Sequence, residues 1–256
     1  MFKRNTLRIA MAALIGVAGL ASLPQNANAI PTLQLGISGG SYDSASETIF
    51  SSGSSFALYA FLIADRSNTI GDTYYLSMAV TPQVLTSANL GSFTYNGNAV
   101  NVTSGMTLGT PPIDLFSSAH DAGDLSPHGV FPTYFKEVGF SFSSADQSAE
   151  FNTQDNPSWG AQAGSGMYYK LFNIDTSNLG GGYEIHFDLY NTKLCTKGKG
   201  QCGGATDTDI TQFAPFSHDA QSFTTPVPEP EIYAMLGLGL GLMGFVARRR
   251  KQQAAA

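Results

Sequence analysis

The clearest structural signal in this sequence is the stretch Tyr183-Glu184-Ile185-His186-Phe187-Asp188-Leu189-Tyr190. Its odd-numbered positions are apolar, whereas its even-numbered positions are charged or titratable. Side chains of a strand point alternately to its two faces, so this alternation predicts a half-buried β-strand.

Shorter stretches between residues 30 and 225 alternate in the same way, and Gly, Asn, Ser and Asp separate them. No long helical pattern and no internal repeat occurs there. The 17 Phe and 11 Tyr supply enough apolar volume for one core. Many short strands separated by turn residues predict an all-β domain over 30–225, a sandwich or a jelly roll. The other alternating positions are Leu33, Leu35 and Ile37; Phe56, Leu58, Ala60 and Leu62; Tyr74, Leu76, Met78 and Val80; and Val138, Phe140 and Phe142.

The charge of this domain is strongly negative. Residues 30–225 contain six basic and seventeen acidic side chains, a net charge of −11, although the whole chain carries only −6. Such a surface repels phosphate backbones, so we expect no nucleic-acid partner. Cations, or basic groups on a polymer, are the natural counter-charges.

The N-terminus has the order of segments typical of a signal peptide. A basic start is followed by the apolar run Ile9–Leu20 and by small residues at Ala27 and Ala29. We predict that residues 1–29 form a signal peptide cleaved after Ala29. An uncleaved anchor is the alternative, but the apolar run is short for a spanning helix.

Export places the two cysteines, Cys195 and Cys202, in an oxidising compartment. We therefore predict a disulfide between them that closes a small Lys- and Gly-rich loop. A metal site is the alternative, but two thiolates without a nearby histidine are a poor ligand set for zinc.

The C-terminal segment 226–256 has three parts in order. A stiff proline-rich motif, Val227-Pro228-Glu229-Pro230, comes first. The uncharged run Ile232–Ala247 follows; its sixteen residues would span about 24 Å as a helix. A basic stop made of Arg248, Arg249, Arg250 and Lys251 ends it, and we expect these side chains to stay cytoplasmic. The layout predicts a transmembrane helix that holds the folded domain outside the inner membrane. A permanent single-span anchor is the alternative.

These three parts closely resemble the PEP-CTERM sorting signal. The resemblance implies recognition by exosortase, a membrane-embedded processing enzyme, and cleavage near Val227–Pro230. It also implies a transient stay in the inner membrane, followed by transfer to the cell surface or the extracellular matrix.

The domain itself resembles the choice-of-anchor N proteins. The similar segments are spread along the mature chain, which implies one surface domain without known catalysis. They are Leu33–Asp43, Ser126–Phe135, Ile185–Lys193 and Phe213–Ser222.

Candidate metal ligands occur in three places. Glu184, His186 and Asp188 share one face of their strand, where they either hold a cation or form a solvated outer face. Loop residues either bind a structural calcium ion or cap turns; we take Asp207 and Asp209 as the better calcium pair. We expect no cofactor other than such a structural calcium ion. The further loop residues are His120, Asp121, Asp124 and His128 in one loop and His218 and Asp219 in another.

Two features address catalysis and sugar binding. Gly36-Ile37-Ser38-Gly39-Gly40 matches the pattern of a hydrolase nucleophile elbow, but no helix is predicted after it, so we expect a simple turn. Trp159 either stacks on a sugar ring or covers the edge of the core. We expect a non-enzymatic surface protein with a structural, cation-binding or polysaccharide-binding role. The alternatives are a surface-polymer hydrolase and a carbohydrate-binding module.

Overall fold

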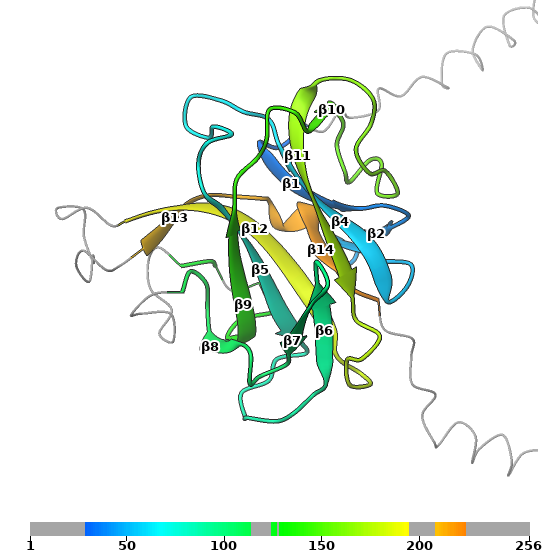
Figure 1. Cartoon of the computed structure of the whole chain (residues 1–256), viewed down its shortest axis with the longest axis vertical. Helices are drawn as coiled ribbons and strands as arrows, with labels where there is room; N and C mark the ends of the chain where they lie inside the picture. Colours follow the sequence, from blue (N-terminus) through cyan, green and yellow to red (C-terminus); the bar gives the residue numbers. More distant parts are fainter. Residues whose placement is uncertain (1–28, 114–123, 127, 195–207, 224–256) are drawn as a thin grey trace, which may run out of the picture. The chain divides into compact units, whose positions relative to one another are not determined.

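The structure is a computed structural model, and it describes residues 29–113, 124–126, 128–194 and 208–223. In these ranges the regular structure consists of β-strands and one short 3-10 helix, η1 (Phe216–His218). Figure 1 shows two sheets built from segments that are far apart in the sequence. The all-β prediction is therefore confirmed.

The first sheet has the strand order β1-β4-β11-β6-β7, and β10 pairs with β11 outside this path. Its longest ladder joins β4 and β11 through eight antiparallel residue pairs. The strands are β1 (Leu33–Ile37), β4 (Ser55–Leu62), β6 (Ser92–Tyr95), β7 (Asn98–Asn101), β10 (Gln147–Ala149) and β11 (Gly166–Asp175).

The second sheet has the order β2-β3-β14-β12-β5-β9-β8, and β13 also pairs with β12. The strand predicted over 183–190 is the first part of β12, which lies in the middle of this sheet. The strands are β2 (Ser41–Asp43), β3 (Thr48–Phe50), β5 (Tyr74–Thr81), β8 (Thr107–Gly109), β9 (Thr133–Phe140), β12 (Glu184–Leu194), β13 (Thr208–Phe213) and β14 (Asp219–Gln221).

The main core lies between the two sheets. The odd-numbered side chains of β12, Ile185, Phe187 and Leu189, are buried there beside residues of the first sheet such as Leu58 and Phe172. Apolar area removed from water on both inner faces is the main stabilising contribution to such a layered fold. The alternation read from the sequence thus gives the correct inward face of β12.

The outer face of the second sheet is also covered. Leu125, Val130 and Phe131, which precede β9, form a second apolar cluster on it together with Ala79 of β5 and Phe135 of β9. Ile210 and Phe216, from β13 and η1, pack against this cluster. The even-numbered side chains of β12 therefore lie on a face that other segments shield from solvent.

The Gly36–Gly40 stretch forms a turn, as expected. Gly36 and Ile37 end β1, Gly39 adopts a positive φ of 74°, and the amide of Gly40 donates to the carbonyl of Ile37 at 2.9 Å. Strand β2 follows instead of a helix. A nucleophile elbow needs a strand followed by a helix, so this stretch lacks the geometry of a hydrolase site.

Candidate metal centre

His186 and Asp188 lie on the covered outer face of β12, and each is only 2 % exposed. They follow Glu184 at alternate positions, as the sequence predicted. This burial excludes a solvated outer face at these two positions, because such a face would leave both side chains in water. Buried charged groups need a partner, a proton or a metal ion.

Two more side chains reach the same point from other segments. Asp219 is the first residue of β14, which pairs with β12 through His186↔Gln221 and Phe187↔Ala220. His128 lies just before β9, in the segment that covers the outer face. Its ring stacks on Phe216 with centroids 4.2 Å apart and meets Phe131 edge-on.

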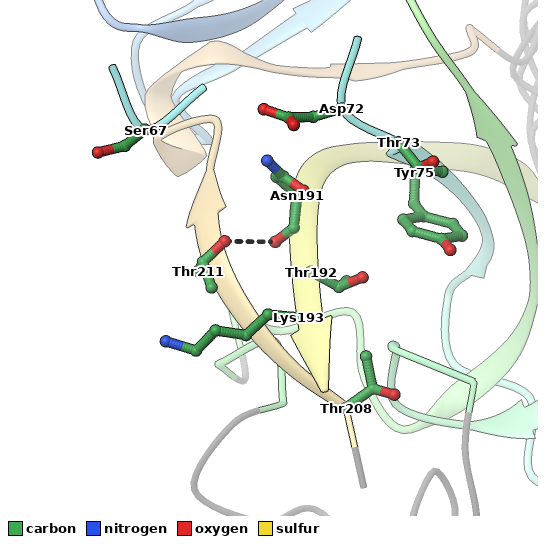
Figure 2. A pocket seen from close by; sticks show the side chains of 9 residues that line it. All are labelled: Ser67, Asp72, Thr73, Tyr75, Asn191, Thr192, Lys193, Thr208 and Thr211. Atoms are coloured by element: carbon green, nitrogen blue, oxygen red, sulfur yellow. Dashed lines mark hydrogen bonds between the residues drawn. The ribbon is translucent and has the colours of Figure 1, made fainter. Parts of the chain in front are cut away.

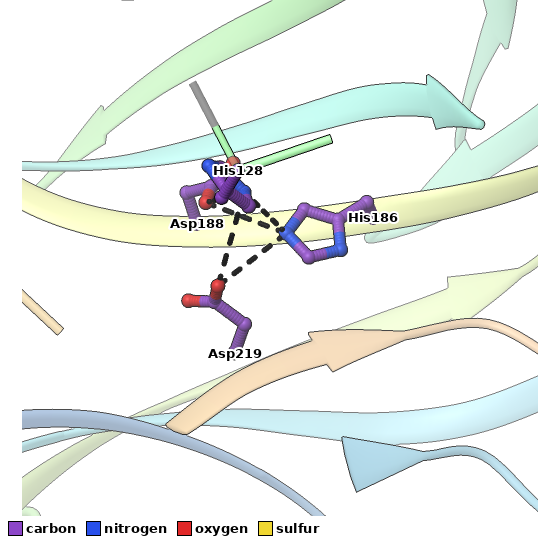
Figure 3. A group of neighbouring side chains, drawn as sticks. All are labelled: His128, His186, Asp188 and Asp219. Carbon is purple, nitrogen blue, oxygen red and sulfur yellow. Dashed lines mark hydrogen bonds and ion pairs between the residues drawn. The ribbon is translucent and has the colours of Figure 1, made fainter. Parts of the chain in front are cut away.

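The four polar ends converge, as Figure 3 shows. The Nε2 atoms of His128 and His186 are 3.1 Å apart. Asp188 Oδ1 is 3.2 Å from the first of these nitrogens and 3.4 Å from the second. Asp219 Oδ2 lies 3.9 Å from His128 Nε2 and 3.5 Å from His186 Nε2. Four donors held at about 2.0–2.2 Å around a tetrahedral zinc ion would be about 3.3–3.6 Å apart, close to this spacing.

The outer nitrogens of both imidazoles have acceptor partners. Nδ1 of His128 lies 3.0 Å from the carbonyl oxygen of Ser126, and Nδ1 of His186 lies 3.2 Å from Oε1 of Gln221. The amide of Gln221 donates through Nε2 to Glu184, which fixes its oxygen toward His186. A hydrogen on each Nδ1 would satisfy these acceptors, and each neutral ring would then direct the lone pair of Nε2 into the cluster. This is the arrangement that orients histidines as metal ligands.

Protons alone satisfy this cluster poorly. If His186 were protonated at Nε2, its single N–H could point to only one of the three acceptors around it. Among the described residues, Oδ2 of Asp188 and Oδ1 of Asp219 have no hydrogen-bond partner, although both residues are buried. A divalent cation would compensate both carboxylates and both lone pairs at once.

The pKa directions reflect the crowding of two carboxyl groups. Burial opposes the charge on Asp188, but His186 and His128 outweigh it and lower the pKa of this carboxyl. Burial and the neighbouring Asp188 raise the pKa of Asp219 to about 7. Burial opposes the charge on His186, but Asp188 and Asp219 raise the pKa of the imidazole. When two carboxyl groups are buried close together without a cation, the pKa of one is lowered and the pKa of the other is raised.

The donor set indicates the class of ion. Calcium takes six to eight oxygen ligands, and magnesium prefers an octahedron of oxygens, so two imidazoles suit neither. Imidazole together with carboxylate suits zinc and its first-row neighbours. A cavity of about 360 Å³, lined by His128, His186 and Asp219 and rimmed by Ser46 and Glu47, gives an ion a route to the site.

The other predicted ligands lie elsewhere. Glu184 bonds to Gln221 and is outside the cluster, and Asp209 lies opposite Lys193 in the β12–β13 ladder. His218 is buried and bonds through Nε2 to Asn152; burial lowers its pKa to about 4. Trp159 is 43 % exposed and packs on Phe151. Asp207, His120, Asp121, Cys195 and Cys202 lie outside the described residues, so the predicted calcium pair and disulfide stay predictions.

A second cavity, of about 770 Å³, lies beside β12 and β13 (Figure 2). Its lining is polar: Asp72, Tyr75, Asn191 and Lys193 contribute to it, and the hydroxyl of Thr211 donates to the carbonyl of Asn191 at 3.3 Å. Hydroxyl, amide and charged groups in this lining could form hydrogen bonds with a polar ligand.

The C-terminal segment is the part of the chain that comparison with known families recognises. Residues 226–251 match the PEP-CTERM protein-sorting motif. Signals of this kind direct export and surface sorting, so the chain is one that exosortase sorts to the cell surface. The matched range includes the proline-rich motif, the apolar run and the basic stop of the C-terminal segment.

Neither a curated protein nor a solved structure matches this chain. The resemblance of the body to choice-of-anchor N proteins therefore finds no support. Among the described residues, no helix has the length and apolar character needed to cross a bilayer; the predicted membrane helix over 232–247 lies outside them, as do residues 1–28.

Proposed function

We propose that this chain is an exported surface protein whose two-sheet body binds one divalent transition-metal ion of the zinc class in a structural role. The observation that carries the proposal is the convergence of two imidazoles and two carboxylates from three separate segments. Four protein donors complete a tetrahedral shell and leave no position for a reactive water, as in structural zinc sites. This supports a binding role over the hydrolase alternative.

The second part of the proposal is the route by which the chain reaches the cell surface. The signal peptide is removed after Ala29, and the segment 232–247 holds the chain in the inner membrane until exosortase acts near Val227–Pro230. The body then reaches the cell surface or the extracellular matrix. The order of proline motif, apolar run and basic stop supports this route.

Metal analysis tests the binding role. The full-length chain, purified in detergent and equilibrated with zinc, is expected to retain about one ion per molecule after removal of free metal, because the described residues contain one such set of four donors. His128→Ala removes the most exposed of the four proposed ligands and is expected to abolish retention, whereas the control Asp209→Ala is expected to keep it. Elemental analysis of each sample is the measurement. A wild-type chain that retains no transition metal contradicts the proposal.

Polysaccharide binding is a second candidate, favoured by the polar cavity of Figure 2. Lys193 is exposed at its rim, and Tyr75 offers a ring face. Lys193→Ala is expected to weaken retardation of the protein in gels that contain the host's extracellular polysaccharide. The control Lys170→Ala, on the first sheet, is expected to leave it unchanged. Equal mobility of wild type and Lys193→Ala in such gels counts against this candidate.

A further inference from the structure

We infer that the metal ion acts as a latch that fastens β14, the strand leading into the sorting segment, to the central strand β12. The inference rests on the proposed function, since it assigns a task to the same ion. Its starting point is the position of the ligands, because Asp188 and His186 belong to β12 whereas Asp219 belongs to β14.

The seam between these two strands is short. β12 pairs with β5 through eight residue pairs but with β14 through only two. Ser222 extends the seam: its amide donates to the carbonyl of Ile185 at 2.9 Å, and its hydroxyl accepts from the amide of Ile185 at 2.8 Å. So few hydrogen bonds give a seam that opens more readily than its neighbours.

The seam ends where two carboxylates face each other. The register pairs His186 with Gln221 and Phe187 with Ala220, so the next antiparallel positions are Asp188 and Asp219. Like charges opposite each other on neighbouring strands are destabilising, and burial strengthens the repulsion. A divalent cation between them converts this repulsion into a cross-link at the end of the seam.

Strand β14 also connects the edge strands β2 and β3 to the rest of the second sheet. Within the described residues, β2 and β3 join the second sheet through the parallel pairing of β3 with β14. The amide of Ser51 donates to the carbonyl of Gln221 at 3.0 Å, and the Ser51 hydroxyl accepts from the amide of Phe223 at 2.8 Å. Opening of the β12–β14 seam therefore loosens β2, β3 and β14 as one unit.

This unit is next to the sorting segment. β14 ends at Gln221, and the matched sorting motif begins at residue 226. With the ion bound, β14 stays paired with β12 as far as Gln221. The body therefore keeps its last strand before and after processing. Without the ion, the last strand and the β2–β3 edge open together.

Hydrogen exchange on the full-length chain in detergent tests the latch. Without metal, amides of β3 and β14 are expected to exchange at least about tenfold faster than those of β4 and β11, because they open locally. Free zinc at about 100 times its dissociation constant is expected to slow them about 100-fold, or down to the rate of β4 and β11, because opening must release the ion. Peptides covering 41–51, 216–223, 56–62 and 168–175 report the two groups by mass spectrometry.

Asp219→Asn is expected to abolish this zinc effect on β3 and β14, and the matched control Asp209→Asn is expected to retain it. Zinc affinity is measured on the same samples by competition with a chromophoric chelator. Binding without slower exchange of β3 and β14, or equal exchange of the two groups in the metal-free chain, overturns the latch and leaves the proposed function standing. Absence of zinc binding overturns both.

Discussion

Zinc added to the metal-free full-length chain is expected to raise its melting temperature by about 8 to 16 °C. An ion present at about 1,000 times its dissociation constant stabilises the folded state by about 4 kcal/mol. For a body of this size, 1 kcal/mol corresponds to about 2 to 4 °C. Thermal unfolding of the chain in detergent, followed by circular dichroism with and without zinc, is the measurement. Calcium at the same concentration is expected to give no comparable shift, because two of the four donors are imidazoles.

The variant Asp219→Asn separates a metal centre from a network of protonated ion pairs. Asparagine keeps the shape of the side chain but removes one of the two carboxylates that meet at the end of the β12–β14 seam. In a metal centre, the variant loses the zinc shift, while its metal-free form is at least as stable as the metal-free wild type because repulsion is relieved. Asp209→Asn, on β13, keeps the full zinc shift.

An ion-pair network predicts the opposite behaviour. There Asp219 would stabilise the fold by pairing with His186, whose Nε2 is 3.5 Å away, so Asp219→Asn would lower the melting temperature without metal. Zinc would have no effect on either chain. A wild-type melting temperature that does not respond to zinc, together with a destabilised Asp219→Asn variant, therefore argues against the metal centre.

Replacement of Pro228, Glu229 and Pro230 by alanine is expected to abolish C-terminal processing of the exported chain. The three residues lie within the matched sorting motif, and proline restricts a chain to extended conformations that a processing enzyme can bind. Mass spectrometry of the C-terminus is expected to find wild-type chain that ends near Val227–Pro230 and triple-variant chain that still ends in Ala256. The unprocessed form is expected to stay with the inner membrane in cell fractionation.

The control for this experiment lies just beyond the motif. Gln252 and Gln253 follow the matched range 226–251, so their replacement by alanine is expected to leave processing unchanged. Cells without the exosortase are expected to reproduce the defect of the triple variant with the wild-type chain. Wild-type protein that ends in Ala256 in cells containing the enzyme would be incompatible with sorting by this route.

The local sequence pattern predicted two of the four residues of the candidate site to lie on one face. The alternation over Tyr183–Tyr190 placed His186 and Asp188 on the same face of one strand, and the structure brings their polar ends together. Glu184 shares that face but bonds to Gln221 instead. The pattern could not show that this face is covered, because the apolar side chains that shield it come from 125–135 and 210–216.

The other two residues of the candidate site, His128 and Asp219, are distant from β12 in the sequence. The sequence groups His128 with His120, Asp121 and Asp124 in one loop, and Asp219 with His218 in another. In the structure, His218 turns to Asn152, whereas Asp219 and His128 meet β12. The sequence offers only a weak sign that His128 and Asp219 share a site. Each is a titratable residue at the edge of an apolar stretch.

By itself, the sequence determined the all-β class, the inward face of β12, the acidic character of the body and the sorting of the chain to the surface. Each of these depends on composition, on the order of short segments or on a two-residue periodicity, which neighbouring residues alone specify. Only the tertiary structure decided where the candidate metal centre lies. Its four donors come together because β14 pairs with β12 and the segment before β9 folds over them, and such long-range pairing leaves no local pattern in the chain.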